Sequence, residues 1–205
     1  MIEIVGLGPG DLDRVSPETR RLLIDESLPL IVRTLRHPAA EQLAAMREVV
    51  SCDDLYESCD TFEEVYSAIA ERVLAAAPVI YAVPGSPTVG ELAVAEIRRR
   101  SSEVVVRPAE SFLDLMFTRF GVDPLADGFQ LLNGHDLPPV LGFSVPTVVG
   151  HLDREEILAD VLARLGRALP EEAEVSVAVG LGSSDESVVT AHPDDLDAGL
   201  AGLRT

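Results

Sequence analysis

Three glycine-rich segments that each follow a short apolar run are the places where this sequence could bind a ligand and do chemistry. They cover residues 6–11, 84–87 and 180–184. Glycine adopts backbone conformations closed to other residues and lets a ligand approach the main chain, and Pro9 stiffens the first segment. Any one of the three could be a simple tight turn. Because open α/β sheets bind ligands at the carboxyl ends of their strands, the three together predict a ligand site.

The first segment differs from the dinucleotide-binding fingerprint. That pattern is G-x-G-x-x-G, whereas Gly6, Gly8 and Gly10 alternate with single residues. The second apolar run ends at Arg33 and not at an acid that would hold a ribose. An arginine at this position can pair with a 2′-phosphate, so an NADP-binding domain stays open as one alternative.

The composition excludes several classes of function. All sixteen basic residues are arginines, and the missing lysine excludes a Walker-type phosphate loop and a Schiff-base mechanism. The formal net charge of −19 argues against nucleic acid or an anionic membrane as a partner. Cys52 and Cys59 predict neither a zinc site nor a disulfide framework, and the N-terminus has no signal-peptide pattern. We therefore expect a soluble cytoplasmic protein.

No familiar catalytic constellation is present in the sequence. Ser86 lies in G-S-P and not in the G-x-S-x-G turn of a serine nucleophile. The four histidines are scattered without metal-ligand spacing, so we expect no metal. The acidic pairs at 53–54 and 63–64 are typical of a solvated surface. The residues named so far therefore predict no nucleophile and no general base.

Alternating strands and helices must position the glycine segments. The pattern predicts strands at 2–5, 28–32, 49–50, 79–83 and 104–106, and helices at 17–24, 39–47, 61–77 and 88–100. Thr61 with Glu64, and Thr88 with Glu91, have the spacing of helix capping boxes, whereas residues 52–60 are acidic and turn-like. This alternation predicts a mostly parallel sheet with helices on its faces.

The character of the sequence changes near residues 107–112, where we place a boundary between domains at 1–110 and 111–205. Beyond it the pattern predicts helices at 111–120, 155–165 and 193–203, and strands at 130–132, 147–149, 175–179 and 188–189. The last two strands have the spacing of a hairpin across the third glycine segment.

Two of the glycine segments, V-G-L-G-P-G-D at 5–11 and A-V-P-G-S-P at 82–87, resemble the tetrapyrrole (corrin/porphyrin) methylase family, which uses S-adenosylmethionine. Other motifs are similar to one branch of that family, the methylase-like domain at the N-terminus of bacterial proteins that carry a MazG-type nucleoside triphosphate pyrophosphohydrolase domain. These motifs are R-T at 33–34 with H-P at 37–38, D-D-L-Y at 53–56, D-T-F-E-E-V-Y at 60–66, and S-F-L-D at 111–114 before G-V-D-P at 121–124. The resemblance covers nearly the whole chain.

The resemblance implies a two-lobed α/β fold and usually a homodimer. It implies a mostly parallel sheet in the N-terminal lobe, a mixed sheet in the C-terminal lobe and S-adenosylmethionine bound in the cleft between them. Asp11, Arg33 and His37 are the candidates on the substrate side. The cofactor contacts that it implies are Gly8, Pro9, Gly85, Ser86, Val89, Ser111, Phe112, His151, Leu152 and Gly182.

Two functions follow as alternatives. The first is an S-adenosylmethionine-dependent methyltransferase whose acceptor is a small molecule, with a tetrapyrrole-like compound as one candidate. The second is a ligand-sensing or regulatory module for an attached or separate MazG-type pyrophosphohydrolase domain. Methylases of the family carry Gly-Asp-Pro where this chain has Gly-Ser-Pro at 85–87, which removes a charge near the cofactor. The paired E-x-x-E turns that hold magnesium in the hydrolase are not present, since the one E-x-x-E lies at 171–174.

Overall fold

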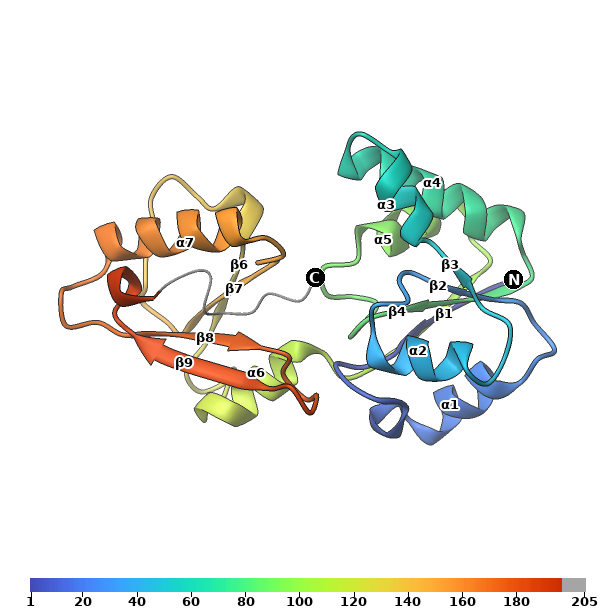
Figure 1. Cartoon of the computed structure of the whole chain (residues 1–205), viewed down its shortest axis with the longest axis horizontal. Helices are drawn as coiled ribbons and strands as arrows, with labels where there is room; N and C mark the ends of the chain where they lie inside the picture. The colour runs from blue at the N-terminus through green and yellow to red at the C-terminus, as the bar shows by residue number, and fades with distance from the viewer. Residues whose placement is uncertain (197–205) are drawn as a thin grey trace. The chain divides into compact units, whose positions relative to one another are not determined.

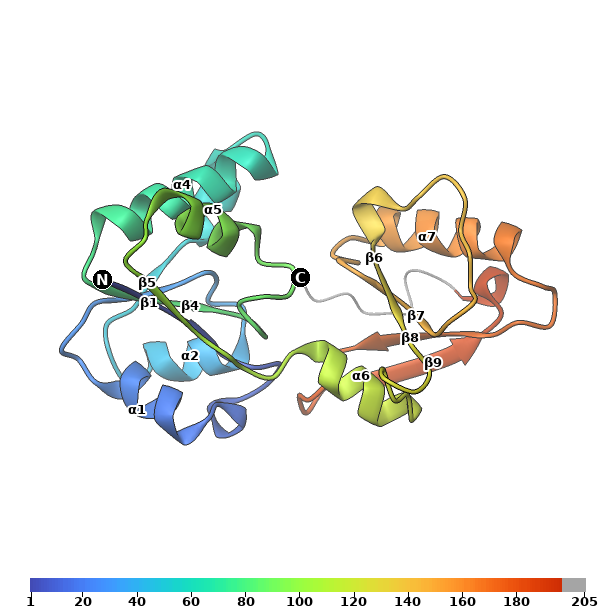
Figure 2. The same cartoon turned by 180° about the vertical axis from the view of Figure 1, so that it is seen from behind.

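The computed structural model describes residues 1–196, and the chain divides into two compact units at residue 112 (Figure 1). The first unit is built on a sheet of five parallel strands in the order β3-β2-β4-β1-β5. Figure 2, seen from the other side, shows β5 beside β1 at one edge. The predicted parallel sheet is confirmed. Its strands are β1 (Ile2–Gly6), β2 (Leu30–Val32), β3 (Val50–Ser51), β4 (Val79–Val83) and β5 (Val104–Arg107).

Helices cover both faces of this sheet because the strands are apolar on both faces. The first face is covered by α1 (Pro17–Ile24) and α2 (Pro38–Ala44), and a short 3-10 helix (Leu12–Arg14) precedes them (Figure 1). The opposite face is covered by α3 (Asp53–Ser58), α4 (Phe62–Ala75) and α5 (Leu92–Arg100). Every residue of β1 and β4 is buried, as expected for a central strand of a parallel sheet.

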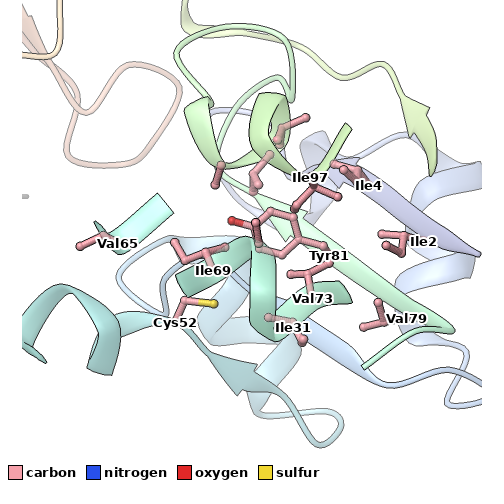
Figure 3. Close-up of a cluster of buried hydrophobic side chains, with 14 residues drawn as sticks. Ile2, Ile4, Ile31, Cys52, Val65, Ile69, Val73, Val79, Tyr81 and Ile97 are labelled. Atoms are coloured by element: carbon pink, nitrogen blue, oxygen red, sulfur yellow. The ribbon is translucent and has the colours of Figure 1, made fainter. Parts of the chain in front are cut away.

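The core on the α3–α5 face contains a large polar side chain. Figure 3 shows Tyr81 of β4 packed among buried aliphatic residues that include Ile69, Val73 and Ile97. Tyr81 is fully buried, including its hydroxyl oxygen. A hydroxyl at this depth is unusual without a hydrogen-bond partner.

One of the two predicted capping boxes is confirmed and the other is wrong. The Thr61 side chain accepts from the Glu64 N–H, and the Glu64 carboxylate accepts from the Thr61 N–H, as the spacing predicts. The second box fails because α5 begins at Leu92, not at residue 88, and Glu91 makes no side-chain cap bond. The Glu91 carboxylate instead faces an arginine at the end of β2.

The acidic segment 52–60, predicted to be a turn, contains the helix α3. Asp53 and Asp54 lie in its first turn, where carboxylates are favourable for the helix dipole. Each also has a specific partner: the Leu35 N–H donates to Asp53, and both terminal nitrogens of Arg72 donate to Asp54, at 2.6 and 2.7 Å. These carboxylates fasten neighbouring segments and do not form a free acidic surface.

The second unit contains strand pairs of both kinds. Strands β6 (Gln130–Asn133) and β7 (Thr147–Gly150) are parallel, whereas β8 (Val175–Val179) and β9 (Ser187–Ala191) form the predicted antiparallel hairpin. Within residues 1–196 these are two separate pairs and not one mixed sheet. The helices of this part are α6 (Phe112–Phe120) and α7 (Glu155–Ala168), with 3-10 helices at Gly134–Asp136 and Pro193–Asp195. The predicted helix 193–203 starts as the second of these, and the rest of it lies outside the described residues.

Leu137, Val161 and Leu165 form the buried centre of the second unit. They come from the segment after the first 3-10 helix of this unit and from the inner face of α7, whose apolar spacing the sequence predicted. In the part of the chain that the structure describes, no helix has the length and apolar character needed to cross a membrane.

Candidate functional site

The first two glycine segments are joined at the carboxyl edge of the five-stranded sheet. The Gly8 N–H donates to the Gly85 carbonyl at 3.1 Å, and the Gly85 N–H donates to the Gly8 carbonyl at 2.9 Å. The Leu7 N–H also donates to the Val83 carbonyl, so the pairing of β1 with β4 continues into the loops. Two segments far apart in the sequence therefore form one backbone platform.

Glycine is required at two positions of this platform for different reasons. A Cβ atom at Gly6 would come within 3.0 Å of the Gly85 carbonyl oxygen and of side-chain atoms of Pro87 and Ala109. Gly85 has φ +59°, a conformation that side chains disfavour, and a Cβ there would have no atom within 4 Å. Gly6 is thus closely packed between three loops, whereas Gly85 faces open space that a ligand can occupy.

A pocket of about 460 Å³ opens beside this platform, between the first glycine segment, the start of α1 and the loop after β5. Arg14 and Glu110 face each other in it at 3.6 Å. Of the predicted cofactor residues, Gly8 lines this pocket. Gly6 also lines it and belongs to the predicted glycine segment, whereas the other walls were not predicted from the sequence. Among these, Ser16 caps α1, since its side chain accepts from the Thr19 N–H. The lining residues are Gly6, Gly8, Arg14, Val15, Ser16, Thr19, Pro108, Ala109 and Glu110.

The other predicted cofactor residues of the first unit lie in the loops at the same edge of the sheet. Ser86 is buried, its hydroxyl lies 3.1 Å from that of Thr88, and its carbonyl accepts from the Val89 N–H. Pro9 follows Gly8 directly. Ser111 is buried after β5, and Phe112 is the first residue of α6. The structure thus brings the loops of β1, β4 and β5 to one edge, as the strand-end argument predicted.

Three predicted cofactor residues belong to the second unit. His151 follows β7 with φ +58°, and its Nδ1 lies 3.3 Å from the Asn133 Oδ1. Leu152 packs against the core of that unit. Gly182 lies in the β8–β9 turn with φ +80°, and its N–H donates to Glu186. Their part in cofactor binding stays a prediction.

The predicted substrate-side residues lie close enough to interact electrostatically. His37 is the residue before α2, where Pro38 begins the helix. The pKa of His37 is lowered to about 4, mainly by burial and further by the charge of Arg33. A hydrogen bond with the Gly8 backbone and the charge of Asp11 act in the opposite direction. The loop that carries Arg33 and His37 is held by the bond from the Leu35 N–H to Asp53. His37 is therefore a neutral imidazole beside the first glycine segment at neutral pH.

Replacing His37 with glutamine should change how stability depends on pH. The pKa of a histidine is about 6.5 in the unfolded chain, whereas the pKa of His37 is about 4 in the folded protein. The contribution of His37 to the free energy of unfolding is therefore complete above pH 6.5 and is lost as the pH falls toward 4. The largest loss is about 3 kcal/mol. Urea denaturation between pH 4 and 7 measures the difference between wild type and His37→Gln, which should shrink as the pH falls.

The variant is needed because a second group acts in the opposite sense. Burial raises the pKa of Glu91 to about 7, above its ordinary 4.5. The contribution of Glu91 to the free energy of unfolding is therefore complete below pH 4.5 and is lost as the pH rises toward 7. The two effects partly cancel in the wild-type protein. A difference between wild type and His37→Gln that is constant over this range would contradict the assignment.

The arrangement supports binding and orientation more than covalent catalysis. Burial raises the pKa of the Cys52 thiol to about 11, against the opposing effect of Arg72, so Cys52 is not a thiolate nucleophile at neutral pH. Within residues 1–196 no three histidine, cysteine or acidic side chains are grouped as metal ligands would be.

Comparison with known proteins gives consistent findings. The model of the family described as Tetrapyrrole (Corrin/Porphyrin) Methylases matches residues 1–197. The chain is 33% identical to "Uncharacterized protein YabN" of Bacillus subtilis (strain 168), over 98% of this chain and 42% of that protein. It therefore spans less than half the length of the curated relative that it matches.

Two solved structures share the fold. The uroporphyrin-III C-methyltransferase of Thermus thermophilus has a TM-score of 0.71 at 23% identity, covering 100% of this chain and 88% of that one. A structure of the Thermus enzyme complexed with S-adenosylhomocysteine has a TM-score of 0.59 at 23% identity, covering 97% and 86%. The α/β fold predicted from the sequence is confirmed by this likeness.

Proposed function

This chain belongs to the tetrapyrrole (corrin/porphyrin) methylase family, and from that premise we propose that it is an S-adenosylmethionine-dependent methyltransferase. The observation that carries the proposal is the backbone platform of Gly8 and Gly85. Both glycines have positive φ, at +69° and +59°, and the space next to Gly85 is open. A cofactor can approach the main chain there more closely than it could approach any side chain. The solved Thermus relative with S-adenosylhomocysteine supports the choice of cofactor.

The residues of the platform fit such a cofactor. Gly8, Pro9, Gly85, Ser86 and Val89 would hold it through main-chain groups and short side chains, with Ser111 and Phe112 as the next wall. S-adenosylmethionine supplies an activated methyl group on a sulfonium, so the protein need not provide a nucleophile. The role of the chain is then to hold the acceptor in line and to exclude water.

The test of the proposal is an isothermal titration of the purified protein with S-adenosylmethionine and with S-adenosylhomocysteine. NADPH serves as the control, because an arginine at the end of the second strand is also compatible with that cofactor. We expect binding of the first two ligands and none of NADPH. Binding of NADPH alone, or of no ligand, would contradict the proposal.

A ligand-sensing module is the second candidate function. It is favoured by the length of the relative, of which this chain covers 42%, and by the neutral Ser86 at a position where methylases of the family carry an acid. A sensor would bind the cofactor without turnover. Release of S-adenosylhomocysteine from S-adenosylmethionine in a cell extract only when the protein is added would favour the enzyme, and tight binding without release would favour the sensor. The partner proposed for the sensor is a MazG-type pyrophosphohydrolase.

We further propose a small-molecule acceptor and a homodimer. We place the acceptor near Asp11, Arg33 and His37, and the family makes a tetrapyrrole-like molecule its first candidate. The dimer rests on the family alone. Sedimentation as a monomer at micromolar concentration would count against it.

A further inference from the structure

Four polar side chains form a cluster on the α3–α5 face at the end of β2, and the proposed function has used only Arg33 of these. They are Arg33, Tyr56, Tyr81 and Glu91, from the β2 end, α3, β4 and the residue before α5. The Arg33 Nε and the hydroxyls of Tyr56 and Tyr81 are buried and make no hydrogen bond of good geometry. Burying such a group without a partner is unfavourable, so folded proteins retain few of them. The Arg33 Nε faces the Glu91 carboxylate, so two phenolic hydroxyls are left beside a guanidinium, and this indicates a site for a polar ligand.

Arg33 is fixed at its backbone and along its side chain. Its N–H donates to the Ala82 carbonyl at 2.9 Å, which extends the β2–β4 pairing by one residue. Its Nε lies 3.4 Å from the Glu91 Oε1, and the Glu91 side chain is 5% exposed. The Arg33 side chain is 28% exposed, and its two terminal nitrogens are not among the buried atoms without partners. The guanidinium therefore turns its Nε toward a buried carboxylate and leaves its terminal nitrogens accessible.

The charges in the cluster favour an anionic ligand. Burial lowers the pKa of Arg33, but its electrostatic interactions with Glu91 and with the tyrosines around it outweigh burial and give a net rise, so Arg33 stays cationic. Burial raises the pKa of Tyr81 well above its ordinary value, so its hydroxyl is a donor at neutral pH. The cluster thus offers two guanidinium nitrogens and phenolic hydroxyls, and Glu91 is the acid paired with Arg33 within residues 1–196.

We propose that the terminal nitrogens of Arg33 bind one oxyanion group, a carboxylate or a phosphate, of the molecule that receives the methyl group. Glu91 is the positioning residue that holds the guanidinium in place. The planar fork of arginine matches both oxyanions with two parallel hydrogen bonds, which a lysine cannot provide. Identifying the ligand as the methyl acceptor rests on the proposed function, whereas the oxyanion site rests on the cluster itself.

Thermal unfolding with inorganic phosphate or acetate, against chloride at equal ionic strength, tests the site. A ligand that binds the folded protein raises the unfolding temperature until it saturates. We expect saturable stabilisation of the wild type by at least one of the two anions. The anion that binds more tightly identifies the group on the natural ligand as a phosphate or a carboxylate. In Arg33→Met the saturable stabilisation should disappear. In Arg33→Lys the affinity for the anion should fall roughly tenfold to a hundredfold, since one charge-assisted hydrogen bond is lost.

Arg36→Met is the matched control, because Arg36 lies in the same loop, is exposed and carries the same charge. It should keep the wild-type affinity within about twofold. Each variant is compared with its own melting curve in chloride, so a change in intrinsic stability does not obscure the result. The proposal is overturned if neither anion saturates on the wild type, if Arg33→Met responds as the wild type does, or if Arg36→Met loses the effect equally.

The positioning role of Glu91 has its own readout. Glu91→Gln should weaken the anion several-fold in the wild-type background but not in the Arg33→Lys background, where no Nε faces the carboxylate. Equal weakening in both backgrounds would show a general structural effect and overturn this role. Titration of Arg33→Met with S-adenosylhomocysteine separates the two proposals. If the protein binds the cofactor but the wild type binds neither anion, the oxyanion site is wrong and the methyltransferase proposal stands. If the wild type binds an anion but not the cofactor, the methyltransferase proposal is wrong and the oxyanion site stands.

Discussion

Gly6→Ala should destabilise the first unit by more than about 3 kcal/mol and remove cofactor binding. The new methyl group would come within 3.0 Å of the Gly85 carbonyl oxygen and of atoms of Pro87 and Ala109. Overpacking in a core costs about 1–3 kcal/mol when flexible side chains can yield. Here a backbone carbonyl and a proline ring of the loop after β4 must move, together with Ala109 of the loop after β5. Urea denaturation monitored by circular dichroism measures the loss, and titration with S-adenosylhomocysteine measures the binding.

Gly142→Ala is the control for this substitution. A Cβ atom at Gly142 has no neighbour within 4 Å, and its φ is not in the positive range. The change from glycine to alanine acts there mainly through the unfolded chain, and it should be neutral or stabilising by about 0.4–1 kcal/mol. If Gly6→Ala changes the free energy of unfolding no more than Gly142→Ala does, the three loops are not closely packed at Gly6.

Gly85→Val should reduce the affinity for S-adenosylhomocysteine by at least roughly 100-fold while the protein stays folded. A Cβ atom at Gly85 meets no protein atom within 4 Å, so the valine side chain enters the open space and takes the place of the ligand. The positive φ of +59° adds strain of about 1–3 kcal/mol, which the fold can tolerate. Isothermal titration gives the affinity, and the unfolding transition shows that the variant is folded.

Gly121→Val separates the strain from the occupied space. Gly121 has φ +64° and also has no atom within 4 Å of a Cβ, but it lies in the second unit, outside the loops of the platform. It should therefore lose stability to a similar extent and keep the wild-type affinity. Unchanged cofactor affinity in Gly85→Val would refute the proposed placement of the cofactor, and an equal loss in Gly121→Val would show that strain alone explains the effect.

Local sequence patterns predicted the elements that depend on local interactions. The alternation of apolar strands with helices gave the parallel sheet of the first unit, and the Thr61–Glu64 spacing gave the start of α4. These features follow from periodicity and from hydrogen bonds between near neighbours in the chain. The same reasoning was wrong for Glu91, since its spacing from Thr88 fits a capping box although its carboxylate pairs with Arg33.

The candidate site was predicted in its position and not in its composition. The glycine segments at 6–11 and 84–87 lie at the carboxyl ends of strands, as expected, but nothing in the sequence shows that Gly8 and Gly85 bond to each other. The pocket residues Arg14 and Glu110 also come from distant segments. Their meeting depends on the strand order β4-β1-β5, which a single sequence does not specify.

The sequence by itself determined that this chain is an α/β protein with glycine loops at its strand ends and with motifs of the tetrapyrrole methylase family. The tertiary structure decided which of those loops join, which glycine is closely packed and which is open, and that Glu91 holds Arg33. The physical reason is the range of the interactions. Helix caps and periodic apolar faces involve residues a few positions apart, whereas a site depends on contacts between segments that only the folded sheet brings together.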